Sequence, residues 1–116
     1  SALRKHGVTT PQYSALVALG AGEPLSGAEL ARRCFVTPQT MNGIIVGLEE
    51  AGLVHRTPHP EHGRIIDTHL TNEGMSRLRQ ADQAIGKIEE AMLDGFTPRK
   101  RQELRSALRR CAENLE

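Results

Sequence analysis

The side chains with the clearest chemical use follow Thr37-Pro38, a pair that signals the start of a helix. Threonine is a good helix cap, and proline fits the first helical position because no N–H is needed there. Amide and hydroxyl groups at the exposed start of a helix can hydrogen-bond to base edges in the major groove of DNA. The predicted contact residues are Thr37, Gln39, Thr40, Asn42 and Gly43. The alternative is that they are solvated residues of an ordinary helix.

A second set of candidates is cationic. Arg64 stands at the exit of a loop rich in proline and glycine, and Arg56 stands near its entrance. An arginine carried by such a loop can reach a minor groove or a phosphate. The predicted loop and backbone contacts are Arg64, Arg56, His62, Arg32 and Arg33. Ion pairs within the chain are the alternative, between Arg64 and Asp67 or between Glu29 and one of the two adjacent arginines.

Two helices joined by a tight turn, within residues 26–52, must position these groups. Ser26 and Glu29 have the spacing of a capping box, in which each side chain accepts from the other residue's backbone N–H. The turn at residues 34–36 is too short for anything but a sharp crossing of two packed helices. Helical spacing predicts that the second helix packs inward through Met41, Ile44, Ile45 and Leu48. The pattern predicts a helix-turn-helix.

The pattern after Gly52 changes to that of a hairpin. Residues 53–57 can be extended, and residues 64–70 alternate apolar and polar side chains as a strand does. Residues 58–63 contain two prolines and a glycine, which is typical of a loop. Two strands and a loop directly after a helix-turn-helix predict a wing, with Arg64 at the end of its loop.

The chain is expected to form one continuous domain with three parts. Residues 1–20 hold the remnant of an N-terminal helix and a second, short helix with Thr10 as its cap. Residues 21–71 form the winged helix-turn-helix lobe, and residues 72–116 form dimerisation helices. We expect residues upstream of Ser1 to complete the first helix.

Two long helices are predicted after the wing. Thr71 caps the first, which runs from Asn72 to about Asp94 and is stopped by Gly95, and Thr97-Pro98 starts the second. Apolar residues recur along both at steps of three and four, a spacing suited to a helical partner. The two helices carry more apolar residues than one small core needs to bury. Because two-fold symmetric dimers are the commonest oligomers, we expect a homodimer. The predicted interface of a homodimer is Leu78, Ile85, Ile88, Met92, Leu104, Leu108, Cys111 and Leu115.

Composition sets the broad class of the protein. The chain has 116 residues, 38% hydrophobic and only 3% aromatic, which fits one soluble domain with an aliphatic core. Its net charge of +1 means that a basic surface for nucleic acid must be local or supplied by a dimer. No segment approaches the length of a membrane span and no signal peptide is present, so a cytoplasmic protein is expected.

Enzyme and metal motifs are missing from the sequence. There is no Gly-rich phosphate loop, paired-carboxylate cleft, nucleophile–base motif or cofactor motif, so we predict no enzymatic activity. The four histidines near the loop lack the defined ligand spacing of a zinc site and are expected to be solvated; they are His55, His59, His62 and His69. Cys34 and Cys111 are interpreted as free, buried thiols.

With these features the chain resembles the MarR family of bacterial transcriptional regulators. The strongest matches are LEEAGLVHR at residues 48–56, after the second helix of the motif, and LTNEG at residues 70–74, after the wing. Between them, Arg64 matches the arginine of a frequent Asp-x-Arg wing motif, while His62 replaces the aspartate. Thr40 matches a common threonine of the recognition helix.

The resemblance implies a mainly α fold with a small β-hairpin wing, that is, a winged helix-turn-helix plus long C-terminal dimerisation helices. It also implies a homodimeric repressor of transcription that binds double-stranded DNA at a pseudo-palindromic operator. A small anionic or phenolic effector, or an oxidant, often releases the DNA from such proteins. Tyr13 is a candidate to line the effector cleft between the DNA-binding lobe and the dimer helices, with a core position as the alternative.

The sequence departs from the family pattern inside the recognition helix. Many relatives carry charged residues where this chain has Gly43, Val46 and Gly47. The absence of these charged residues removes phosphate or guanine contacts and lowers the local positive charge. The alternative function is therefore a winged-helix module for protein–protein contact with weak or no DNA binding.

Overall fold

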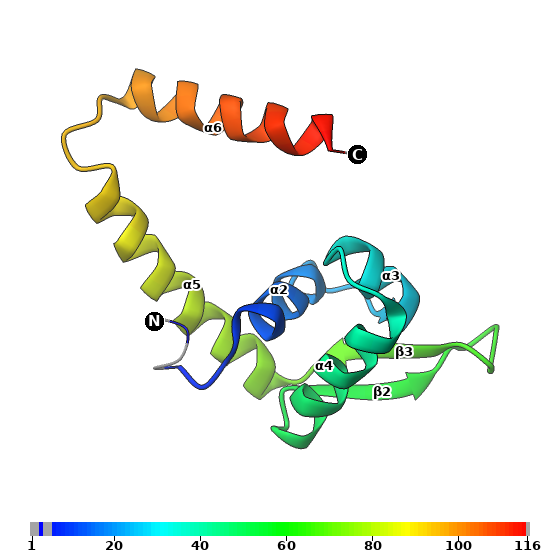
Figure 1. Ribbon diagram of the computed structural model, residues 1–116. Coiled ribbons are helices and arrows are strands. Elements are labelled where there is room, and N and C mark those ends of the chain that lie inside the picture. Colours follow the sequence, from blue (N-terminus) through cyan, green and yellow to red (C-terminus); the bar gives the residue numbers. More distant parts are fainter. Residues whose placement is uncertain (1–2, 4–5, 116) are drawn as a thin grey trace. The chain divides into compact units, whose positions relative to one another are not determined.

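The structure, a computed structural model, describes residue 3 and residues 6–115 (Figure 1). The contacts divide the chain into two compact units, Ser1–Ile85 and Gly86–Glu116. The elements in chain order are α2 Thr10–Leu19, β1 Leu25–Ser26, α3 Gly27–Arg33, α4 Pro38–Glu50, β2 Val54–Pro58, β3 Ile66–Leu70, α5 Asn72–Met92 and α6 Pro98–Asn114. The predicted fold class, a mainly helical winged helix-turn-helix followed by two long helices, is confirmed.

Polar side chains cap α3 and α4 at the predicted residues. Ser26 Oγ accepts from the N–H of Glu29, and Glu29 Oε1 accepts from the N–H of Ser26, both at 3.2 Å. The bond from the backbone of Ser26 is the main reason that the pKa of Glu29 lies below its usual range. Thr37 Oγ1 accepts from the N–H of Thr40 at 3.1 Å, which fixes the start of α4.

The cap of α2 is Thr9 and not the predicted Thr10. Thr9 Oγ1 accepts from the N–H of Gln12 at 3.2 Å, and Gln12 Oε1 accepts from the N–H of Thr9 at 3.0 Å. Gln12 stands three residues after Thr9, so only a cap at Thr9 completes a capping box. Pro11 still lies in the first turn, where a missing N–H costs nothing.

The turn between α3 and α4 is the three-residue crossing that the sequence predicts. Phe35 has a φ of 57°, a left-handed conformation that glycine usually supplies at a helix end. The N–H of Phe35 bonds to the carbonyl of Arg32 at 3.3 Å, and the N–H of Val36 bonds to the carbonyl of Ala31 at 3.1 Å. This pair of bonds is a Schellman motif, which ends α3 abruptly and lets α4 start at once.

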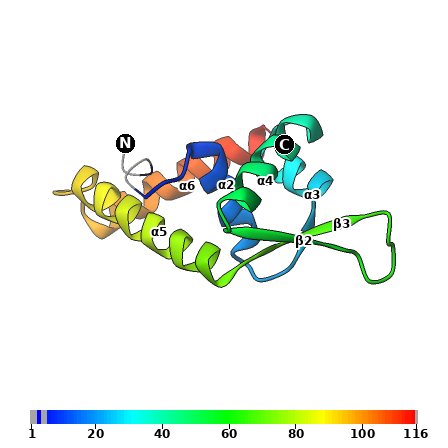
Figure 2. The same ribbon diagram turned by 90° about the horizontal axis from the view of Figure 1, so that it is seen from below.

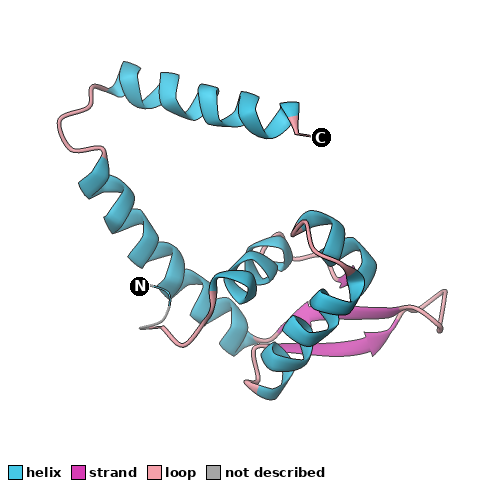
Figure 3. Ribbon diagram, viewed as in Figure 1, coloured by secondary structure: helices cyan, strands magenta, loops and turns pink. Residues whose placement is uncertain are grey.

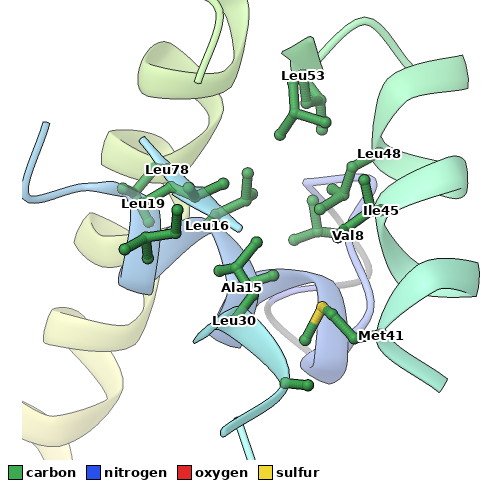
Figure 4. Close-up of a cluster of buried hydrophobic side chains, with 13 residues drawn as sticks. Val8, Ala15, Leu16, Leu19, Leu30, Met41, Ile45, Leu48, Leu53 and Leu78 are labelled. Carbon is green, nitrogen blue, oxygen red and sulfur yellow. The ribbon is translucent and has the colours of Figure 1, made fainter. Parts of the chain in front are cut away.

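An aliphatic core holds the first unit together, as Figure 4 shows. The inward face of α4 is buried through Met41, Ile45 and Leu48, and Ile44 packs at the edge of the core. Other elements contribute Leu16, Leu19, Leu30, Leu53 and Leu78. The predicted inward face of α4 is therefore correct, and the opposite face remains at the surface.

The sheet has three antiparallel strands in the order β1-β3-β2, drawn in magenta in Figure 3. The hairpin pairs β2 with β3 from Val54 opposite Leu70 to Pro58 opposite Ile66, and its loop extends beyond the strands (Figure 2). β1 is an unpredicted third strand, in which Leu25 pairs with Thr68. It ties the start of α3 to the wing.

The second strand of the hairpin starts later than predicted. The sequence pattern places Arg64 and Ile65 in the strand, whereas the structure places both in the loop. The N–H of His59 bonds to the carbonyl of Ile65 at 2.8 Å, and the N–H of Ile65 bonds to the carbonyl of His62 at 2.8 Å. These bonds close the loop across residues 59–65 before the regular pairing begins.

Thr71 joins the start of α5 to the end of the helix-turn-helix. Its hydroxyl donates to the carbonyl of Gly52 at 2.7 Å and accepts from the N–H of Gly74 at 2.9 Å. Its own N–H donates to the carbonyl of Leu53 at 3.1 Å. The predicted cap is thus confirmed, and it also fastens α5 to the first strand of the wing.

The second unit contains the end of α5, a turn at Gly95 with a positive φ of 85°, and α6. Arg101 stabilises the turn through Glu90, with Nη1 to Oε2 at 2.8 Å, and through the carbonyl of Leu93 at 3.0 Å. No residue of α6 is buried in the described part of this chain, so Cys111 is exposed, contrary to the predicted buried thiol. None of the described helices combines the length and apolar character needed to cross a membrane.

Candidate nucleic-acid interface

The start of α4 presents the predicted polar residues at the surface. The exposed residues are Thr37, Gln39, Thr40, Asn42 and Gly43. The hydroxyl of Thr37 donates to Oγ1 of Thr40 at 3.0 Å, which leaves the hydrogen of the Thr40 hydroxyl free to point away from the helix. Apart from the nearby backbone of α4 itself, nothing in the described residues lies within 4 Å of where a Cβ on Gly43 would stand. This end of α4 is therefore open to a large partner.

Arg64 lies in the wing loop and is exposed. It makes no hydrogen bond or ion pair with any residue that the structure describes, so the alternative pairing with Asp67 is not formed. Asp67 is only 6% exposed and lies in the sheet opposite Thr57 and Ser26. Among the predicted cations of the hairpin, Arg56 has side-chain partners in the described structure whereas Arg64 has none.

Arg56 is engaged with α4. Its Nη2 lies 2.9 Å from Glu49 Oε1 and its Nε lies 3.4 Å from Oε2, and Nη1 donates to Oδ1 of Asn42 at 3.5 Å. The bond from Arg56 is the main reason that the pKa of Glu49 lies below its usual range. This pairing could not be predicted from sequence, because no spacing rule links Glu49 to a residue beyond the turn. Contact between Arg56 and DNA phosphate stays a prediction.

Arg32 and Arg33 end α3 and are both exposed. Neither lies within ion-pair distance of Glu29 among the described residues, because that carboxylate is taken up by the cap of the same helix. Both cations also stand where the negative end of the helix dipole favours them. Their contact with a DNA backbone stays a prediction.

A pocket of about 410 Å³ lies between α4, the start of α3 and the wing. Asn42, Arg56 and Ile45 line one part of it, and Ile65 and Thr68 line another. The hydroxyl of Thr68 is buried and has no hydrogen-bond partner among the described residues. The pocket was not predicted, because its walls come from segments that are distant in sequence.

The histidines of the wing form two pairs. His55 and His69 face each other across the hairpin with ring centroids 4.8 Å apart and planes 8° apart, and Nε2 of His69 lies 2.7 Å from Oγ1 of Thr57. Nδ1 of His59 accepts from the N–H of His62 at 3.2 Å, which shapes the loop. Among the described residues, no group of three or more His, Cys, Asp or Glu is arranged to hold a metal ion.

Tyr13 connects α2 to α5, since its hydroxyl donates to Oδ1 of Asp82 at 2.5 Å. It also lines a pocket of about 460 Å³ with Val17, Cys34 and Phe35. Burial raises the pKa of the Cys34 thiol, which disfavours the reactive thiolate. Tyr13 is thus neither deep in the core nor free at the surface.

The residues predicted to form the dimer interface differ in their exposure. Leu78 is 6% exposed and packs in the core of the first unit, so it is occupied within the chain rather than at an interface. The others that are exposed lie in or near the second unit, namely Ile88, Met92, Leu104, Leu108, Cys111 and Leu115. Ile85 is half-buried. An interface between chains stays a prediction.

Comparison with known proteins gives concordant matches. The sequence model described as "MarR family" matches residues 6–65. The HTH-type transcriptional repressor Rv2887 of Mycobacterium tuberculosis is 33% identical over 108 residues, which are 93% of this chain and 78% of that protein. Among solved structures, the PcaV transcriptional regulator of Streptomyces coelicolor, in complex with its natural ligand, has a TM-score of 0.80 at 26% identity, covering 94% of this chain and 77% of that one. The transcriptional regulator PA4135 has a TM-score of 0.85 at 22% identity over 97% of this chain and 82% of that one, which shows the fold.

Proposed function

The chain belongs to the MarR family of helix-turn-helix transcriptional regulators, and from this premise we propose that it is a homodimeric repressor acting at a pseudo-palindromic operator. Proteins of this family regulate transcription and are not enzymes, as the sequence predicts for this chain. A repressor of bacterial genes works in the cytoplasm, where the chromosome lies.

The observation that carries the proposal is the exposed polar start of α4 beside an unpaired wing arginine. Gln39, Thr40 and Asn42 offer donors and acceptors that match base edges in a major groove. Arg64 extends from the adjacent loop with its guanidinium free for a phosphate or a narrow minor groove.

The apolar residues of the second unit support the proposed dimerisation. Met92, Leu104 and Leu108 line one groove of about 350 Å³ between the end of α5 and α6, and they remain exposed in the single chain. Exposed apolar groups clustered in this way mark an interaction surface. A second copy of the chain would cover them and would place two α4 helices on one duplex.

The proposal is tested by selecting binding sites from random duplex DNA, then titrating the enriched site at two salt concentrations. We expect an inverted repeat with half-sites about one helical turn apart, roughly 34 Å centre to centre. Affinity should fall steeply with salt, because each phosphate contact releases counterions. Absence of any enriched sequence, in a sample that contains a stable dimer, would instead favour a protein-binding module.

A small anionic or phenolic effector would control this binding. The structural relative PcaV was crystallised with its natural ligand, which supports a ligand-responsive protein here. The pocket beside Tyr13 has apolar walls from Val17 and Phe35 and a cation from Arg33, which suit an aromatic anion. With 2-hydroxybenzoate as the probe, we expect a higher melting temperature and release of the operator, and a smaller response in Tyr13→Ala. If millimolar 2-hydroxybenzoate changes neither the melting temperature nor the binding of the operator, this compound does not belong to the effector class.

A further inference from the structure

We infer that Asn42 reads a hydrogen-bond acceptor on a base edge, with guanine as its best match, and that the Glu49–Arg56 ion pair sets this preference. The inference rests on the proposed function, since it specifies what one residue of the DNA-binding helix recognises. It concerns the contact between Nη1 of Arg56 and Oδ1 of Asn42 at 3.5 Å.

The orientation of the Asn42 amide follows from the chemistry of its partner. A guanidinium carries only donors, so the amide atom that faces it must be the oxygen and not the nitrogen. The placement of Oδ1 toward Arg56 therefore agrees with the charge and donor count of the guanidinium. The nitrogen end is turned away from Arg56 and donates to no acceptor among the residues that the structure describes.

Glu49 holds the Arg56 guanidinium in the position where it contacts the Asn42 amide. The carboxylate binds the guanidinium through both Nε and Nη2, the two-point geometry that arginine and carboxylate prefer. Glu49 lies near the end of α4 and Arg56 lies on β2, so the pair connects the recognition helix to the wing. Asn42 stands on the same helix, two turns before Glu49, and completes a fixed chain of three polar groups.

An asparagine held in this way offers its N–H groups to DNA. In the major groove, guanine presents two acceptors, N7 and O6, whereas adenine presents a donor at N6 next to its acceptor at N7. Recognition of adenine by both amide atoms would need Oδ1, which faces the wing. Arg56 is thus a positioning residue, which acts on the base through Asn42.

The test is a set of base-preference profiles for the intact protein, each obtained by selection from random duplexes. The wild-type profile and the Asn42→Ala profile together identify the position that Asn42 reads, because only that position loses its preference. We expect guanine there. Replacing it with 7-deazaguanine, which lacks the N7 acceptor, should weaken wild-type binding about fivefold, the effect of one hydrogen bond, and leave Asn42→Ala unaffected.

The role of the ion pair is tested by Glu49→Gln and Arg56→Ala. Both variants free the amide to turn, so adenine should become acceptable at the same position while preferences elsewhere persist. Glu50→Gln is the matched control, because Glu50 is exposed, adjacent in sequence and makes no ion pair in the described residues, yet the charge change is identical. The control should keep the guanine preference. A change confined to stability or overall affinity would assign the pair a structural role and overturn the inference.

Other results separate this inference from the proposed function. An operator with adenine at the position read by Asn42, or with no position that depends on Asn42, overturns the inference and leaves the repressor intact. No sequence-specific binding by the wild type removes both.

Discussion

Arg64 is the residue that we propose carries the wing's contact with DNA. It is exposed and carries no internal partner in the described structure, whereas Arg56 is occupied by Glu49 and Asn42. Because the chain's net charge is only +1, we expect this cation to supply a measurable part of the electrostatic attraction to DNA.

We expect Arg64→Ala to weaken binding to all duplexes and to reduce the slope of log affinity against log salt by about 0.9 per bound arginine. Electrophoretic shift titrations at two salt concentrations measure both quantities. Arg99→Ala is the control, since Arg99 is an exposed arginine of α6 and its loss changes the net charge by the same amount. Equal effects of the two changes would mean that Arg64 acts only through net charge.

Gly43 lowers the stability of the recognition helix and leaves its surface without a side chain at that position. A glycine in a helix interior costs about 0.5–1 kcal/mol relative to alanine. Apart from the nearby backbone of its own helix, nothing in the described chain lies within 4 Å of a Cβ built on Gly43 or on Gly86, so neither glycine is required by packing against other elements.

Both Gly43→Ala and Gly86→Ala should therefore raise the free energy of unfolding, by about 0.5–1 kcal/mol each. Only Gly43→Ala should also lower DNA affinity, because its methyl group would stand between α4 and the base edges. Urea unfolding and operator titration on the same samples separate the two effects. If Gly43→Ala binds as tightly as the wild type, Gly43 is not in contact with DNA.

At the scale of elements, hydrogen bonds and a close backbone contact attach the start of α5 to the residues that lead into the wing. Thr71 bonds to Gly52, Leu53 and Gly74, and the first turn of the helix lies directly on the backbone of Leu53. A Cβ on Gly74 would stand 2.0 Å from the carbonyl oxygen of Leu53. Only glycine, which has no Cβ, fits this position without a shift of the backbone. The LTNEG pattern at residues 70–74 thus has a steric reason.

Gly74→Ala should lower the free energy of unfolding by about 1–3 kcal/mol or more, because backbone must shift to admit the methyl group. Chemical unfolding followed by circular dichroism measures the loss. Asn72→Ala, at an exposed neighbouring position of the same turn, serves as the control and should stay within about 0.5 kcal/mol of the wild type. A Gly74→Ala protein as stable as this control would contradict the close contact.

At the scale of the whole molecule, the proposed dimer would use an apolar surface that one chain leaves exposed. Leu108 is 61% exposed and Met92 is 71% exposed, although both are large and apolar. The first unit, in contrast, buries its own aliphatic residues around Leu16, Leu48 and Leu78. The second unit therefore suits association rather than independent stability.

Leu108→Glu should yield a folded monomer that binds operator DNA weakly, because a charge would be placed in the predicted interface. Sedimentation velocity measures the association, and circular dichroism checks that the helices persist. Ser106→Glu adds the same charge two residues away, on another side of α6, and should leave the dimer intact. A tight dimer in the Leu108→Glu protein would place the interface elsewhere.

The sequence alone determined the elements that depend on neighbouring residues. Helix caps at Ser26, Thr37 and Thr71, the inward face of α4 and the three-residue turn are set by spacings of three to four residues or fewer. Each rests on local steric and hydrogen-bonding rules, so it can be read without knowledge of the fold. The same spacing rules placed one cap a residue late, at Thr10, because two adjacent threonines compete and Gln12 decides between them.

Only the tertiary structure decided which groups meet across the chain. The approach of Arg56 to Glu49 and Asn42, the pairing of β1 with β3 and the placement of Leu78 in the core depend on how separate segments pack. Residues with the same periodicity can face a core or a partner, and an arginine can face solvent or a carboxylate. The sequence pattern is identical in either case, because the choice is made by contacts between residues that are far apart along the chain.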